Sequence, residues 1–229
     1  MKNFPTVPFF EPYLDAQDKS EISKALSSTY LTNGPKLDDF EQKFKKFTGS
    51  KFAVGVSNAT SALHLSLKAL DIKKGDEVIV PNLTFVATAN SVLASGATPV
   101  IADVEEDTMN ISPKSIMKNL SKKTKAIIPV HFAGVSCDML SISKIAKKNS
   151  LKIIEDCAHG IGTFFGKKHV GNFGQVGCFS FYPTKNITTI EGGMIITNNK
   201  KIANFIKLSR NHGISRTLLD RYSSGFPWE

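Results

Sequence analysis

The sequence predicts a three-layer αβα domain built on a mostly parallel, seven-stranded sheet. Short apolar or β-branched runs recur along the chain, and amphipathic helical patterns lie between them. Most of the runs are continuously apolar, as expected for strands that are buried on both faces. Alternation of such strands with helices is typical of βαβ units. The length of 229 residues suits one large domain better than two.

The predicted elements follow one another in a regular order. The seven strands are expected at residues 52–56, 77–80, 98–104, 126–132, 151–154, 177–182 and 193–197. Helices with one apolar face are expected at residues 38–47, 59–70, 87–95 and 139–149. Sheets of this kind bind ligands at the carboxyl ends of their strands. Functional side chains should therefore follow directly after strands.

The composition and charge of the chain favour a globular domain that does not bind nucleic acid. The chain is 41% hydrophobic and 21% charged, which is ordinary for a globular domain. The formal net charge of +9 would attract an anionic partner, but the lysines are scattered in short pairs. A lysine-rich solvated surface is the favoured explanation. Because no motif for binding nucleic acid occurs, we expect no nucleic-acid partner.

The sequence predicts a cytoplasmic protein that does not enter a membrane. Residues 1–5 lack the apolar run of a signal peptide, and no apolar stretch approaches the length of a membrane span. Cys137, Cys157 and Cys178 are few, odd in number and widely spaced. They suggest reduced thiols and not a disulfide framework.

Ser57-Asn58-Ala59-Thr60 follows the first predicted strand and opens a helix. Small residues at a helix N-terminus leave backbone N–H groups free to bind a phosphate. The Thr60 hydroxyl could add a hydrogen bond. Taken alone, the segment is better explained as an ordinary helix cap, because Ser and Asn are favoured there.

A carboxylate and a histidine follow the strand at residues 151–154, in the segment Glu155-Asp156-Cys157-Ala158-His159-Gly160. An acidic residue at the end of a buried strand is costly unless it meets a cation or several donors. The segment could pair a carboxylate with a protonated ring nitrogen, or it could cap a turn. His159 by itself would more often be a satisfied hydrogen-bonding residue than a catalytic one.

Lys185 lies between an aromatic-rich strand and the Gly192-Gly193 entry to the last strand. Its amine could bind an aldehyde covalently, given a lowered pKa. An exposed loop lysine is the alternative, and the segment alone does not separate the two interpretations.

Together, a phosphate-binding helix start, an acid and a lysine are what pyridoxal phosphate (PLP) requires. Their order resembles the aspartate-aminotransferase-like superfamily and, more closely, the DegT/DnrJ/EryC1/StrS sugar-aminotransferase family. The resemblance rests on three motifs and extends over nearly the whole chain. They are Asn58-Ala59-Thr60-Ser61-Ala62-Leu63, where Asn-Ala replaces the family's Ser-Gly, Glu155-Asp156-Cys157-Ala158-His159, and Phe179-Ser180-Phe181-Tyr182-Pro183-Thr184-Lys185-Asn186 with Glu191-Gly192-Gly193.

The resemblance implies a role for each matching residue. Lys185 would be the catalytic lysine that holds the cofactor, and Asp156 would pair with its ring nitrogen. Phe85 would stack on one ring face, Ala158 would touch the other, and His159 would approach the ring hydroxyl. The phosphate would be bound by Ala59, Thr60 and Ser180. Residues 32–35 resemble a loop near the substrate.

The resemblance also implies the reaction. An amino acid, expected to be glutamate, would give its nitrogen to PLP. A keto-sugar linked to a nucleotide would then receive it, in amino-sugar and polysaccharide biosynthesis. Residues 1–15 would be an N-terminal arm and residues 16–229 the PLP-binding large domain, while the family's C-terminal small domain is absent. Relatives suggest a homodimer if the C-terminal part is supplied, and turnover by this chain alone is in doubt.

Other functions were weighed against this one. PLP-dependent sugar dehydratases of the family carry a histidine in place of the lysine, so Lys185 argues against that activity. A truncated, non-catalytic PLP-binding relative stays open. The glycines at 160, 162 and 166 superficially suggest a dinucleotide loop, but Phe165 replaces the third glycine of the pattern and residues 167–171 predict a turn. No histidine pair has the spacing of metal ligands.

Overall fold

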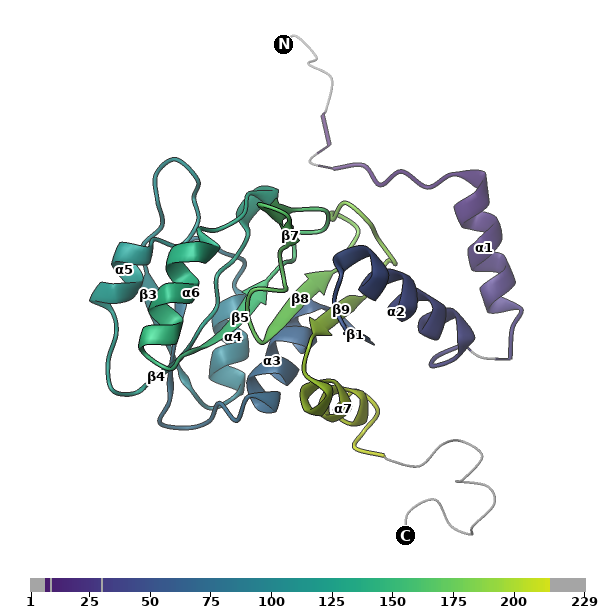
Figure 1. The fold of residues 1–229 in the computed structure, drawn as a ribbon. Coiled ribbons are helices and arrows are strands. Elements are labelled where there is room, and N and C mark those ends of the chain that lie inside the picture. The colour runs from purple at the N-terminus through teal and green to yellow at the C-terminus, as the bar shows by residue number, and fades with distance from the viewer. Residues whose placement is uncertain (1–6, 9, 30, 215–229) are drawn as a thin grey trace, which may run out of the picture.

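A seven-stranded sheet forms the centre of the computed structural model, which describes residues 7, 8, 10–29 and 31–214 (Figure 1). The spatial order of its strands is β1-β9-β8-β5-β4-β2-β3. Only β9 runs antiparallel to its neighbours among these seven strands. The strands are β1 (Phe52–Val56), β2 (Glu77–Pro81), β3 (Thr98–Ala102), β4 (Thr124–Ile127), β5 (Lys152–Asp156), β8 (Val176–Ser180) and β9 (Gly193–Thr197). The predicted fold class is confirmed.

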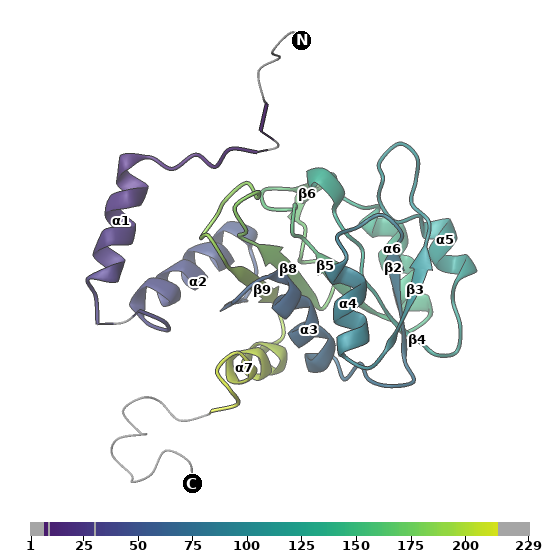
Figure 2. The same cartoon turned by 180° about the vertical axis from the view of Figure 1, so that it is seen from behind.

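Helices cover both faces of the sheet, as the two opposite views show (Figures 1 and 2). One face carries α3 (Ala59–Ala69), α4 (Ala87–Ala94) and α7 (Lys200–Ser209), which pack on one apolar cluster. The other face carries α5 (Pro113–Lys118) and α6 (Met139–Lys148) on a second cluster and α2 (Pro35–Thr48) on a third. Continuously apolar strands were therefore the correct signal for burial on both faces.

Alternation along β5 decides which way the acidic residues at its end point. Ile154 packs in the cluster beneath α3, whereas Ile153 packs in the cluster beneath α6. Because successive strand residues point to opposite faces, Asp156 points toward the side of α3 and α4, and Glu155 toward the opposite side.

Three helices of the structure were not predicted. α1 (Ala16–Leu26) begins with an Asp15–Asp18 capping box but has no buried residue, and it stands away from the body of the sheet (Figure 1). α5 is only six residues long, and α7 follows the cap residue Asn199. A helix as short as α5, or one without a buried apolar face such as α1, gives little periodic signal. α7 does bury an apolar face, through Ile202, Ala203 and Ile206, so its periodic signal was present in the sequence and was missed.

Strand ends also differ from the prediction. The strand expected at 126–132 ends at Ile127, and Phe132 lies in the short 3₁₀ turn η1 (Phe132–Gly134). Pro129 has no N–H to donate and interrupts the regular ladder, although its carbonyl accepts from Asp156 N. The strands expected at 98–104 and 177–182 end at Ala102 and Ser180.

The structure bears on the state of the cysteines and on the question of a membrane span. Cys137, Cys157 and Cys178 are free and buried. Within residues 7–29 and 31–214, apart from residue 9, we find no helix with the length and apolar character required to cross a bilayer.

Candidate active site

Three predicted segments converge where the carboxyl ends of β1, β5 and β8 meet. The first is the N-terminus of α3, which β1 delivers. The Asn58 side chain caps this helix by accepting from Ser61 N at 2.8 Å. Gly193 lies against the same turn, because a Cβ added to it would lie 2.5 Å from the Asn58 carbonyl carbon and 2.9 Å from Ala59 N. The half-buried Ala59 and the exposed Thr60 therefore lie beside the start of β9.

Ser180 joins this group from the last position of β8. It is the register partner of Gly193, and its Oγ accepts weakly from Tyr182 N at 3.4 Å. Residues 59, 60 and 180 thus surround one helix N-terminus, where backbone N–H groups and the helix dipole favour an anion.

Asp156 ends β5 and is only 5% exposed. Its Oδ1 accepts from Ala158 N at 3.1 Å, and its Oδ2 accepts from the Thr88 hydroxyl at 2.9 Å. Burial raises the pKa of this carboxyl, whereas the two hydrogen bonds act in the opposite direction. A cationic partner would stabilise the ionised form further.

His159 is half-buried and has a defined tautomer. Its Nδ1 accepts from Ala133 N at 3.2 Å, so in the neutral ring the proton is on Nε2. Ala133 occupies the left-handed region at φ 49°, in the η1 turn, and this turn aims its N–H at the histidine. Burial and then the charge of Lys185 lower the pKa of His159. His159 is therefore a neutral donor through Nε2.

Lys185 lies on the loop after β8 and is half-buried. Burial lowers the pKa of its amine, and the charge of Asp156 partly opposes that effect. Lys185 interacts electrostatically with both Asp156 and His159. The structure thus brings together the lysine, the acid and the histidine that the sequence singled out.

Phe85 and Ala158 lie near Asp156 but contribute differently. Phe85 lies two residues before α4, its carbonyl accepts from Thr88 N, and it is 75% exposed. Ala158 is half-buried beside Asp156, to which it donates its backbone N–H. A large exposed apolar ring is available to stack on a flat ligand.

Glu155 forms a buried network behind the site. Its carboxylate accepts from the backbone N–H groups of Gly171, Phe173 and Gly174, each at 2.7 Å. Its Oε2 also lies 3.2 Å from His131 Nε2, and His131 Nδ1 accepts from Cys137 N. Because both ring nitrogens and both carboxylate oxygens already have partners, this cluster stabilises the fold around β5. His131 thus hydrogen-bonds within the fold.

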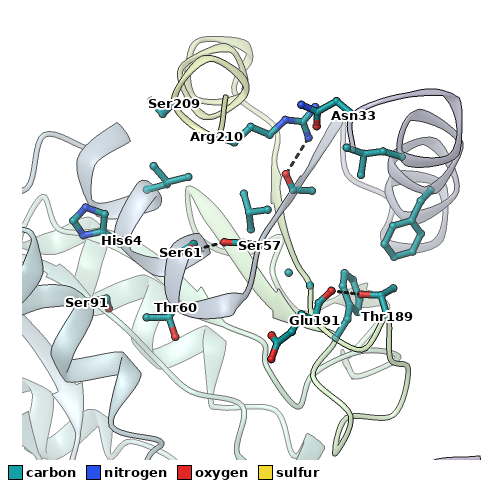
Figure 3. A pocket seen from close by; sticks show the side chains of 18 of the residues that line it. Asn33, Ser57, Thr60, Ser61, His64, Ser91, Thr189, Glu191, Ser209 and Arg210 are labelled. Atoms are coloured by element: carbon teal, nitrogen blue, oxygen red, sulfur yellow. Dashed lines mark hydrogen bonds between the residues drawn. The ribbon is translucent and has the colours of Figure 1, made fainter. Parts of the chain in front are cut away.

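Two open pockets flank the site. The first has a volume of about 820 Å³ and lies beside the α3 N-terminus (Figure 3). Arg210 enters it from the end of α7, donates to the Gly55 carbonyl at 2.9 Å and pairs with the buried Glu41. The second, of about 800 Å³, lies between the Lys185 loop and α1.

The structure also bears on two weaker expectations. Asn33 lines the first pocket and contacts Asn211 at 3.4 Å, so the segment at residues 32–35 reaches the pocket beside the N-terminus of α3. The glycine pattern at 160–166 is no dinucleotide loop, because β6 (Phe164–Phe165) and β7 (Lys168–His169) form a hairpin there instead of a helix. The chain end at Gly225–Glu229 lies outside the described residues.

Sequence reasoning missed four polar residues around the site. Thr88 contacts Asp156 directly, and Thr84 contacts it through Thr88. Glu41 and Arg210 pair at the edge of the first pocket. The available signal was a polar residue on an apolar helix face: Thr88 on α4, and Glu41 between Phe40 and Phe44 on α2. The partner of each comes from a distant segment, which the sequence does not reveal.

Comparison with known proteins finds relatives that match nearly the whole of this chain. The spore coat polysaccharide biosynthesis protein SpsC of Bacillus subtilis is 42% identical over 222 residues, or 97% of this chain and 57% of SpsC. The aminotransferase from Psychrobacter cryohalolentis has a TM-score of 0.89 at 39% identity, over 96% of this chain and 57% of that one. This chain thus spans little more than half the length of the relatives it matches.

Two further structures bear on the ligands of such proteins. The PLP form of a putative sugar aminotransferase, Spr1654 of Streptococcus pneumoniae, has a TM-score of 0.84 at 29% identity, over 88% of this chain and 57% of that one. DesI, solved in the presence of its TDP-sugar product, has a TM-score of 0.83 at 32% identity, over 89% of this chain and 52% of that one.

The sequence pattern of one family matches residues 12–226. Relatives solved in PLP and pyridoxamine phosphate forms share the fold of this chain. The chain therefore belongs to the DegT/DnrJ/EryC1/StrS aminotransferase family, whose cofactor is pyridoxal 5′-phosphate.

Proposed function

We propose that this chain is the cofactor-binding part of an aminotransferase that moves an amino group from an amino acid, glutamate, to a nucleotide-linked keto-sugar. One observation carries the proposal: Lys185, Asp156 and His159 interact at the strand ends that also deliver the α3 N-terminus. Residues 16–229 would form the PLP-binding large domain, preceded by an arm at residues 1–15.

The donor set fits the cofactor. PLP, when bound, supplies an aldehyde that takes up amino nitrogen and a ring that accepts an electron pair from the substrate carbon. Lys185 would bind that aldehyde, because burial lowers its pKa and so favours the neutral, nucleophilic amine. The same Nζ would then move a proton to and from the substrate carbon.

Asp156, Phe85, Ala158 and His159 would orient the ring. The Asp156 carboxylate is a buried acceptor suited to a protonated ring nitrogen. Phe85 would stack on one face, and the small Ala158 side chain would allow close approach to the other. His159 Nε2–H would donate to the ring hydroxyl, because Ala133 N already occupies Nδ1.

Ala59, Thr60 and Ser180 would hold the phosphate. They surround the helix start that Gly193 packs against, so backbone N–H groups and two hydroxyls can donate to an anion. The Asn-Ala pair at 58–59 preserves this function, because Asn58 caps Ser61 and leaves the first N–H groups of the helix to the ligand.

Support for a nucleotide-linked sugar comes from relatives and from charge. DesI was solved with a TDP-sugar product, and SpsC is named for polysaccharide biosynthesis. The net charge of +9 suits a diphosphate. This chain spans 57% of SpsC, and the homodimer and the complete reaction are proposed for the protein as a whole.

Borohydride reduction tests the cofactor link. After incubation with PLP, reduction and digestion, we expect a pyridoxyl label on the peptide that contains Lys185. Lys185→Arg keeps the charge but cannot form the link, so its peptide should carry no label. A label distributed over surface lysines in both proteins would refute the assignment.

Addition of amino acids tests the donor. Glutamate should convert the bound cofactor to its pyridoxamine form, as followed by absorbance, whereas Lys185→Arg should show no conversion. Cofactor binding with no conversion by any amino acid would support the alternative of a non-catalytic PLP-binding relative. Loss of a hydroxyl from a nucleotide-sugar without nitrogen transfer would support a dehydratase.

A further inference from the structure

We propose that Thr88, backed by Thr84, is a positioning residue that fixes the orientation of the Asp156 carboxylate and keeps it a hydrogen-bond acceptor for the cofactor ring. The proposal rests on the proposed function, because it assigns a task to the surroundings of Asp156. Thr88 is the second residue of α4 and is fully buried. It precedes its partner Asp156 by 68 residues in the sequence.

The three side chains form a short, directed chain of hydrogen bonds. The Thr88 hydroxyl donates to Asp156 Oδ2 at 2.9 Å, and the hydroxyls of Thr84 and Thr88 lie 2.8 Å apart. An ionised carboxylate only accepts hydrogen bonds, so the Thr88 hydroxyl must donate its single proton to Asp156. Thr84 therefore donates to Thr88, and this strengthens the donation from Thr88.

The contact fixes the side chain of Asp156. Ala158 N holds Oδ1 and Thr88 holds Oδ2, so both carboxylate oxygens are tied to different elements, the turn after β5 and the start of α4. Each oxygen retains a further lone pair that can accept from a ligand. Without Thr88, only the backbone donor of the neighbouring turn would restrain the carboxylate.

The same contact opposes the effect of burial. Burial favours the neutral acid, and hydrogen bonds to the carboxylate favour the ionised form. A neutral Asp156 would lose its attraction for a protonated ring nitrogen. Ionisable groups on other elements also act on Asp156, and those that interact with it are His131, Cys137, Cys157, His159, Cys178 and Lys185.

The experiment compares Thr88→Val, Thr88→Ser and Ser95→Ala in the full chain. Valine preserves the shape of threonine and removes the hydroxyl, whereas serine keeps the hydroxyl. Ser95 is a matched control, because it is also buried on the α4 segment but donates to Val92 O and not to the site. The PLP dissociation constant is measured by absorbance titration between pH 5 and 9, with circular dichroism to verify folding.

We expect Thr88→Val to weaken PLP binding about tenfold at neutral pH, as for loss of one hydrogen bond to a charged group. The fall in affinity toward low pH should begin about one pH unit higher, because Asp156 takes up its proton more readily. Thr88→Ser and Ser95→Ala should follow the unmodified chain at every pH.

The remaining contributions to the pH profile are common to all variants, so the difference between profiles isolates Asp156. Thr84→Val, at a half-buried position, should shift the profile in the same direction by a smaller amount, and it provides the test if Thr88→Val does not fold. An unshifted profile in the folded threonine-to-valine variants would overturn this inference alone. Absence of PLP binding by the unmodified chain would overturn the proposed function as well.

Discussion

Single residues decide how closely the segments of the site can approach one another. Gly193 is the clearest case, because its missing Cβ leaves room for the turn that starts α3. A side chain there would meet the backbone of Asn58 and Ala59, and backbone cannot move aside as a flexible side chain can. The helix start and the strand end can thus form the proposed phosphate cradle only because position 193 is a glycine.

Gly193→Ala should therefore weaken both the fold and the cradle. We expect a loss of about 1–3 kcal/mol in unfolding free energy, as for overpacking, measured by urea denaturation. PLP affinity should fall as well, because the first N–H groups of α3 are displaced. The control is Gly75→Ala, which has open space at φ 96° and should cost about 1 kcal/mol through backbone strain without loss of PLP affinity. Equal PLP affinity in both variants would contradict the packing argument.

Helix α2 shows how an element is anchored to the sheet. Its Phe44 is 5% exposed and makes edge-on ring contacts with Phe179 and Phe181, at centroid distances of 5.0 and 5.6 Å. Phe47, one turn later on the same helix, is 55% exposed and contacts the His169 ring. The apolar face predicted for residues 38–47 is thus divided between a core position and a surface position.

Phe44→Ala should lower the unfolding free energy by about 3–5 kcal/mol, because it opens a cavity among packed rings. Phe47→Ala removes the same atoms from an exposed position and should cost less than about 1 kcal/mol. Denaturant unfolding of the two variants measures the difference directly. Similar losses in both would mean that α2 is not anchored through the Phe44 cluster.

At the scale of the whole molecule, stability depends on buried polar groups that the net charge does not describe. Burial lowers the pKa values of His169 and His159 in the folded chain. Both ring nitrogens of His169 have hydrogen-bond partners, because Nδ1 lies 2.6 Å from Val170 O and Nε2 accepts from Gly162 N. A proton on Nε2 would displace that backbone donor and leave the β6–β7 hairpin unsupported.

The sign of the pH dependence follows from these lowered values. Above about pH 6.5 both folded and unfolded histidines are neutral, and the full stability is present. As the pH falls, the unfolded chain takes up protons first, so stability is lost down through the lowered folded pKa values. The histidine contribution to the unfolding free energy should therefore decrease from pH 7.5 to 5.

His169→Gln provides the comparison that assigns this loss. Glutamine removes the titratable ring, so the variant should show a shallower decrease than the unmodified chain over the same range. The raised pKa of Asp156 acts in the opposite direction in both proteins and cancels from the difference. Identical slopes would show that His169 does not contribute.

The sequence by itself determined the fold class and supplied the candidate residues from which we propose the site. Continuous apolar runs specified strands buried on both faces, and the polar residues after them placed Lys185 and Asp156 at one edge of the sheet. These signals are local, because they depend on the periodicity and order of neighbouring residues.

Only the tertiary structure decided which distant groups support that site. Thr88 meets Asp156 across 68 residues, Arg210 meets Glu41 across 169, and Gly193 closes on the start of α3. The tautomer of His159 likewise depends on a backbone N–H from the η1 turn, 26 residues away. Such pairings follow from packing and strand order. The periodicity of a single segment carries no information about either.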